Sequence, residues 1–263
     1  MEHEADPPPV EPELDGDGPV FSVRGLTKSY GRKRVLDDLD FDVAKGECLV
    51  ILGRSGSGKS VTLRQLNGLE KPDRGSVTFA GVDLAPLSER DLFPLRKRIA
   101  MLFQSGALFD SMDVYENIAF PLRAHAHPSE EEVAAKVAEV LETVELPGIE
   151  QKLPSELSGG MRKRVALARS LVLQPEVLLF DEPTTGLDPM TSDSIAHTIV
   201  TARDRHHSTA VVVTHDLPLA RTVASRIAFL DEGRFRFIGT FAEAEGSDDP
   251  LLTHFLAGRR EDA

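Results

Sequence analysis

Cysteine is almost absent from this chain of 263 residues. The single Cys48 excludes an intrachain disulfide framework and a Cys-x-x-Cys metal site, and it fits a reducing compartment. No apolar run approaches the roughly 20 residues that a membrane-spanning helix needs. The first residues show neither the charged region nor the apolar region of a secretion signal, so we expect no signal peptide.

Basic residues are fewer than acidic ones: the chain has 30 Lys and Arg and 43 Asp and Glu, which gives a net charge of −13. This balance argues against a broad surface for nucleic acid, so we expect no nucleic-acid partner. Residues 1–20 contain seven acids, five prolines and no Lys or Arg. We therefore predict a disordered acidic tail at 1–19, a globular domain at 20–240 and a polar C-terminal tail at 241–263.

Apolar runs and turn residues predict the order of strands and helices. Short alternating strands occupy residues 20–52, a hairpin follows at 75–84, and residues 88–175 read as mostly helical. The clearest helix begins after Ser129, a candidate N-cap, with Glu132 completing a capping box. Two further apolar runs, 177–180 and 210–214, read as buried strands. Strands alternating with helices predict an α/β fold with a mainly parallel sheet, and its antiparallel strands lie near the amino terminus.

A phosphate-binding loop is the most specific motif. GRSGSGKS at 53–60 matches G-x-x-x-x-G-K-[ST] and lies between a buried strand and a helix, as the motif requires. Its glycines let backbone amides face a phosphate, Lys59 reaches the β- and γ-phosphates, and Ser60 can bind Mg²⁺. The candidate nucleotide-binding residues are Gly53, Arg54, Ser55, Gly56, Ser57, Gly58, Lys59, Ser60 and Val61.

Two later strands end in polar side chains that suit phosphoryl transfer. VLLFDEP at 177–183 places Asp181 at a strand tip, where it could hold Mg²⁺, and Glu182 next to it, where it could polarise a water molecule. The alternative is an acid pair that caps a helix. His215 ends the strand AVVVTH, and the carboxyl ends of strands in an open α/β sheet form the ligand-binding edge.

A second anion site is predicted at LSGG. Ser158 is a natural N-cap, while Gly159 and Gly160 leave the first amides of a helix bare. The basic run 162–164 follows on the same helix, and we interpret it as a solvated face rather than as a nucleic-acid patch. Cys48 reads as a small buried apolar residue. The pairs 125 with 127 and 206 with 207 are histidines without the support that a metal site needs.

Together these motifs resemble the ATP-binding-cassette (ABC) ATPases over about residues 20–240. The resemblance also includes Gln104 in MLFQSGALF and GLDP at 186–189. It implies a RecA-like P-loop NTPase core, an N-terminal antiparallel β layer and a helical subdomain at about 104–175 that carries the signature LSGG. It further implies ATP hydrolysis with ATP and Mg²⁺ as the bound groups.

The resemblance also implies a role for each matching residue. Tyr30 would stack on adenine, Gln104 would contact Mg²⁺ or the attacking water, Glu182 would be the general base and His215 would sense the γ-phosphate. Ser158, Gly159 and Gly160 would bind the γ-phosphate held by the opposite subunit of a homodimer, and Asp188 would bridge the two sites. Two residues depart from the usual pattern: Val61 replaces a hydroxyl residue, and Met161 stands where most members have Gln.

Two segments resemble one branch of the family. Met161 followed by RKRVALARSL, and the run MLFQSGALFDSMDVYENIAFPLR, are similar to ATPases of the Mla type, which serve lipid transporters with MCE proteins. This implies integral-membrane permease subunits on separate chains, an MCE-type lipid-binding partner and a peripheral position at the cytoplasmic face of the inner membrane. The alternatives are another ABC importer of amino acids or other small solutes, a soluble ABC ATPase in repair or translation, and a non-catalytic regulator.

Overall fold

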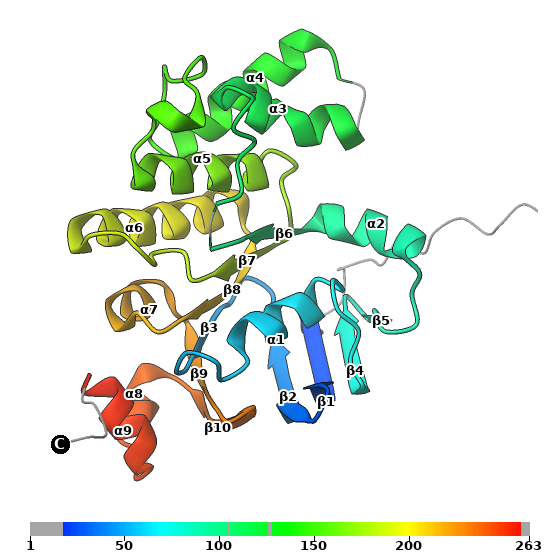
Figure 1. Ribbon diagram of the computed structural model, residues 1–263, viewed down its shortest axis with the longest axis vertical. Helices are drawn as coiled ribbons and strands as arrows, with labels where there is room; N and C mark the ends of the chain where they lie inside the picture. The colour runs from blue at the N-terminus through cyan, green and yellow to red at the C-terminus, as the bar shows by residue number, and fades with distance from the viewer. Residues whose placement is uncertain (1–17, 105, 126–127, 259–263) are drawn as a thin grey trace, which may run out of the picture.

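The computed structural model describes residues 18–104, 106–125 and 128–258 and contains two β-sheets (Figure 1). The predicted acidic tail therefore lies almost entirely outside the described residues. One sheet has six strands in the order β10-β9-β3-β8-β7-β6, and the other has four in the order β2-β1-β4-β5. The strands are β1 (Phe21–Tyr30), β2 (Lys33–Val43), β3 (Cys48–Leu52), β4 (Arg74–Phe79), β5 (Val82–Asp83), β6 (Ile99–Leu102), β7 (Val177–Asp181), β8 (Thr209–Thr214), β9 (Arg226–Asp231) and β10 (Arg234–Gly239).

Helices cover both faces of the six-stranded sheet and extend from one end of the molecule (Figure 1). In the figure α3 and α4 lie at the end opposite the antiparallel sheet, and α5 and α6 lie between them and the strands. The helices are α1 (Lys59–Leu66), α2 (Glu89–Arg98), α3 (Val114–His125), α4 (Glu130–Thr143), α5 (Gly159–Leu171), α6 (Pro189–His206), α7 (Leu217–Val223), α8 (Phe241–Glu245) and α9 (Pro250–Leu256), with a 3-10 turn at Pro154–Glu156.

The central strands are apolar because both of their faces are covered. Strands β9, β3, β8, β7 and β6 run parallel, and every residue of β3 is fully buried. Cys48, Val50 and Leu52 face one core, shared with helices α3, α4, α5 and α6, whereas Leu49 and Ile51 face a second core beneath α1 and the antiparallel sheet. The predicted α/β fold is confirmed. Cys48 is buried as predicted, and burial raises the pKa of its thiol to about 12.

Two strands depart from the sequence prediction. The stretch predicted as mostly helical contains β6, whose four apolar residues follow α2 directly and are too short a run to show a period of two. Strand β10 is antiparallel to β9, so antiparallel pairing is not confined to the amino-terminal part of the chain. Glu232 and Gly233 connect the two strands with φ of 45° and 79°, which is the left-handed conformation of a tight hairpin turn.

Helix α4 begins at its predicted N-cap. Ser129 accepts a hydrogen bond from the amide of Glu132, whose carboxylate accepts one in return from the Ser129 amide, so the capping box is confirmed. The apolar face of α4 and its C-cap is buried, and it consists of Val133, Val137, Val140, Leu141 and Val144. No described helix is both long and apolar enough to cross a bilayer.

The described part of the segment 241–263 is folded into two short helices. Thr240 and Glu243 form a capping box at α8, and Asp249 caps α9. Leu252 is fully buried, and the Phe255 ring lies 5.1 Å from that of Phe229 on β9. The sequence predicts only a polar tail here, because the apolar residues of the segment form one short patch, LLTHFL at 251–256.

Candidate active site

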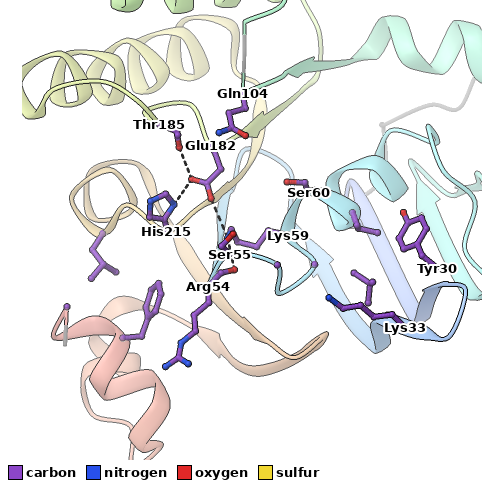
Figure 2. A pocket seen from close by; sticks show the side chains of 17 residues that line it. Tyr30, Lys33, Arg54, Ser55, Lys59, Ser60, Gln104, Glu182, Thr185 and His215 are labelled. Carbon is purple, nitrogen blue, oxygen red and sulfur yellow. Dashed lines mark hydrogen bonds and ion pairs between the residues drawn. The ribbon is translucent and has the colours of Figure 1, made fainter. Parts of the chain in front are cut away.

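A cleft of about 780 Å³ opens at the carboxyl ends of the parallel strands (Figure 2). Strands β3, β8 and β7 are neighbours in the sheet, so the residues that follow them meet at one edge. Eleven of the predicted site residues line this cleft: Tyr30, Arg54, Ser55, Gly56, Gly58, Lys59, Ser60, Val61, Gln104, Glu182 and His215. Of the described site residues that do not line the cleft, Gly53 directly follows β3, Asp181 is the last residue of β7, and Ser57 is buried in the loop between β3 and α1.

The phosphate loop turns on glycines and leads directly into the first turn of α1. Gly56 and Gly58 have φ of 80° and 111°, in the region that glycine adopts without strain. Gly58 is the N-cap of α1 and, having no side chain, makes no capping hydrogen bond to the first amides of that helix. A Cβ on Gly58 would lie 2.7 Å from Leu36 Cδ2 and 2.9 Å from the Val35 carbonyl oxygen. Bare amides at a positive helix end form an anion site.

Lys59 is held inside the loop by three oxygen atoms. Its side chain is only 6% exposed, and Nζ donates to the carbonyl oxygens of Gly53 at 2.9 Å and Arg54 at 3.1 Å. The same Nζ lies 3.3 Å from Glu182 Oε1 (Figure 2). A buried ammonium group needs such partners, and a phosphate entering the loop would compete for this cation with the Glu182 carboxylate.

Glu182 is the side chain on which the polar groups of the cleft converge. Its Oε2 lies 2.9 Å from His215 Nδ1 and accepts a hydrogen bond from the Thr185 hydroxyl at 3.3 Å (Figure 2). The Thr214 hydroxyl donates to the same oxygen, also at 3.3 Å. Its backbone has φ of 48°, a left-handed value unusual for a non-glycine residue, and its amide donates to Val213 on β8. Strained backbone held by neighbouring structure is typical of functional sites.

Asp181 and Ser60 form a pair of hard oxygen donors. The Ser60 hydroxyl donates to Asp181 Oδ1 at 2.8 Å, which joins α1 to the end of β7. Burial raises the pKa of Asp181, while the bond from Ser60 and the charge of Lys59 oppose that rise. A hydroxyl and a carboxylate beside a phosphate loop are the ligand types that Mg²⁺ prefers, so the residues fit that ion.

Tyr30 forms the opposite wall of the cleft, at the end of β1. Its ring is 46% exposed, and its hydroxyl donates to Glu70. Partial burial, and then that hydrogen bond, raise the pKa of Tyr30 to about 12, so the phenol is neutral at ordinary pH. Lys28 Nζ lies 5.9 Å from the ring centre on the same strand. An exposed, neutral aromatic ring is a stacking surface for a base.

Gln104 lies beyond β6 and is held from the side of α5. Its backbone carbonyl accepts a hydrogen bond from Lys163, whose side chain is buried. Arg164 is also turned inward, donating to the Val144 carbonyl and pairing with Glu145 at 3.0 Å. The interpretation of residues 162–164 as a solvated face is therefore correct only for Arg162, which is exposed. It is wrong for Lys163 and Arg164, because consecutive residues of a helix point in different directions and these two side chains are turned into the protein.

The remaining predicted residues form a second group, apart from those lining the cleft. Ser158 caps α5 by accepting from the Met161 amide at 3.2 Å, and Asp188 caps α6 by accepting from the Thr191 amide at 3.0 Å. The two helix starts are packed together, since a Cβ on Gly160 would lie 2.5 Å from Thr191 Cγ2. The structure thus brings the signature and the GLDP turn together. Neither is among the residues that line the cleft of their own chain.

Several cleft residues were not predicted from the sequence. They are Lys33, Val35, Thr185, Leu217, Phe255 and Gly258. Thr185 carried a signal, because it follows Glu182 by three residues in a tight turn. Phe255 and Gly258 carried none, since they reach the cleft only through the packing of α9 beside β9.

This fold and this site define a P-loop nucleoside triphosphatase. A family model described as ABC transporter matches residues 36–185, and the chain belongs to that family. It is an ATP-hydrolysing subunit of an ABC transporter, as the resemblance implied.

Three similar proteins mark its place in the family. A probable ribonucleotide transport ATP-binding protein, mkl, from Mycobacterium leprae is 43% identical over 243 residues, covering 92% of this chain and 70% of that protein. MlaF, the ATP-binding protein of an intermembrane phospholipid transport system in Haemophilus influenzae, is 37% identical over 242 residues, or 92% of each chain. The dimeric cassette MJ0796, solved in a post-hydrolysis state with ADP and Pi, has 32% identity and a TM-score of 0.77, covering 84% of this chain and 98% of that one.

Proposed function

We propose that this chain hydrolyses ATP to drive lipid transport through separate permease subunits. The observation that carries the catalytic part is the convergence of Lys59 and His215 on the Glu182 carboxylate beside the phosphate loop. Glu182 accepts the proton of the attacking water, and His215 orients that carboxylate and contacts the γ-phosphate. Both side chains come from the ends of adjacent strands, so the sheet holds them in place.

The nucleotide lies across the cleft from Tyr30 to Glu182. Tyr30 stacks on the base, the amides of residues 54–61 bind the phosphates, and Lys59 exchanges its contact with Glu182 for the β- and γ-phosphates. Ser60, Asp181 and Gln104 hold Mg²⁺. When bound, this ion neutralises phosphate charge. Val61 contributes only its backbone amide.

Two copies of the chain assemble head to tail around two ATP molecules. Ser158, Gly159 and Gly160 form an anion site that does not line the cleft of its own chain, so a phosphate must come from a partner subunit. Asp188 lies beside that site and bridges to the other nucleotide. A two-fold pair makes both contacts at once and closes on itself, which is the usual symmetry of identical subunits. The dimeric state of MJ0796 supports this assembly.

The transported substrate is a phospholipid or a related lipid. Support comes from the similarity to MlaF along 92% of both chains and from Met161 in the signature. The partners are integral-membrane permease subunits and an MCE-type lipid-binding protein, and the ATPase is peripheral at the cytoplasmic face of the inner membrane. The second candidate is import of a small polar solute, and the name of the mkl relative, which gives ribonucleotide transport without a direction, supports a small polar substrate.

Purification of the membrane complex through a tag on this chain separates these two candidates. We expect a permease, an MCE-type protein and bound phospholipid by mass spectrometry. ATPase activity of the complex in vesicles should rise with phospholipid acceptor membranes and stay unchanged with ribonucleotides or amino acids. Co-purification of a soluble solute-binding protein with no lipid would replace the lipid proposal with the import of a small solute.

A further inference from the structure

Lys163 occupies an unusual environment for a lysine. It lies one turn into α5, is 7% exposed, and donates a hydrogen bond from Nζ to the Gln104 backbone carbonyl. Lysine is almost never fully buried without a partner, because a desolvated charge is costly. Burial lowers the pKa of Lys163, and the charges of Asp181 and Glu182 oppose that change. The ammonium group therefore lies within the field of the catalytic carboxylates.

The same row of α5 contacts the residues that follow Gln104. Lys163, Ala166 and Arg169 are three residues apart and share one side of the helix. Gly106 has φ of 72° and lies against Ala166, where a Cβ would approach the Ala166 Cβ at 3.5 Å. Arg169 donates to the Gly106 carbonyl at 3.4 Å, and its guanidinium lies 5.6 Å from the centre of the Phe109 ring. We call this set of contacts the α5 brace.

The α5 brace connects two sites that serve different nucleotides. The first residues of α5 are the signature, which in the proposed dimer binds the partner's ATP, whereas Gln104 lines the cleft for the chain's own ATP. A hydrogen-bonded helix moves as a rigid element, so a shift at its start carries Lys163 and Arg169 with it. Any such shift would also move the ammonium group that is hydrogen-bonded to the Gln104 carbonyl.

Resting on the head-to-tail dimer proposed above, we propose that Lys163 is a positioning residue that sets the place of Gln104 according to whether the partner's ATP occupies the start of α5. Each active site thereby becomes competent only when the opposite site is filled. Lys163 itself contacts neither nucleotide, and it acts through the backbone of Gln104.

The test uses hydrogen exchange at the amides of residues 106–109 in the full chain carrying Glu182→Gln, which should trap the ATP dimer. In this chain ATP should slow exchange at those amides. Adding Lys163→Met keeps side-chain length but removes the donor, so the dimer should still form while the slowing is lost. Lys163→Arg should restore it, and Lys152→Met, an exposed control, should leave it intact. Should Lys163→Met not fold, Arg169→Met cuts the same brace and should give the same loss.

Kinetics give a second readout. In the chain with Glu182 intact, Lys163→Met should lower kcat about tenfold with the KM for ATP within about twofold, because the phosphate loop is untouched. If the Lys163→Met dimer still shows full slowing of hydrogen exchange at residues 106–109 on ATP binding, the role of Lys163 is overturned. The dimer proposal would remain. A Glu182→Gln chain that stays monomeric with ATP contradicts the dimer itself, and the coupling falls with it.

Discussion

Replacing Glu182 with Gln removes a charge without changing the shape of a side chain that contacts Lys59 and His215. We expect turnover to fall at least roughly 100-fold, because a carboxamide cannot accept the proton of the attacking water. We also expect tighter ATP binding. The substitution releases Lys59 from a competing carboxylate and removes a negative charge that faces the γ-phosphate.

The size of the second effect follows from the geometry. Lys59 Nζ and Glu182 Oε1 are 3.3 Å apart, with side chains 6% and 13% exposed. At an effective dielectric of about 20, the Coulomb attraction at this distance is about 5 kcal/mol. Desolvation of both ions offsets most of this attraction. Lys59 also keeps its hydrogen bonds to two carbonyl oxygens, so we expect the loss of the ion pair to favour ATP binding by about 1.4 kcal/mol. ATP affinity should therefore rise about tenfold.

Calorimetric titration with ATP measures the affinity, and phosphate release measures the turnover. The matched controls are Glu182→Asp, which keeps the charge, and Lys59→Ala, which should lose most ATP binding because the cation facing two phosphates is gone. An unchanged or weaker affinity in Glu182→Gln would show that the ion pair does not compete with the nucleotide. Near-normal turnover in that variant would remove Glu182 as the general base.

Three further outcomes follow from the site. Adding Ser158→Arg to Glu182→Gln should abolish the ATP-dependent dimer that light scattering detects, since a bulky cation would occupy the space of the opposite γ-phosphate. Each subunit should still bind ATP. A dimer that persists would contradict the binding of one subunit's ATP by the signature of the other. Burial raises the pKa of Asp181, so the folded protein holds this proton more tightly than the unfolded chain does. Ionised Asp181 therefore lowers the free energy of unfolding above the raised pKa, whereas below the ordinary value of 3.8 the carboxyl is neutral in both states and has no such effect. Asp181→Asn should therefore raise the Tm at neutral pH, by an amount that shrinks as the pH falls, and a pH-independent gain would refute this cause. Gly53→Ala should lower the free energy of unfolding, measured by urea denaturation, by more than about 3 kcal/mol. The added Cβ would collide with the Leu230 carbonyl oxygen and approach the Ser57 hydroxyl at 2.8 Å. A loss under about 1 kcal/mol would mean that β9 shifts at little cost to make room for the methyl group.

The sequence predicts most of the site because its parts are local. The phosphate loop needs only a buried strand, glycines at left-handed positions and a helix, and all of these lie within residues 48–66. Capping residues such as Ser129 and Ser158 act on amides three residues away, so their role can be read directly. Strand β6 could not be read in this way, since four apolar residues carry no distinguishable period.

The amino-acid order by itself determines the set of elements and the chemistry at their ends. A phosphate loop follows β3, two acids stand at the end of β7, and a histidine follows β8. Tertiary structure decides which of these groups meet. The strand order places β3, β8 and β7 side by side, which brings Lys59 within 3.3 Å of Glu182 and His215 within 2.9 Å of it. It also buries Lys163 against the backbone of Gln104, a contact that no local pattern predicts. The physical reason is that burial and pairing depend on contacts between residues far apart in the chain, whereas turns, caps and periodicity depend on neighbours.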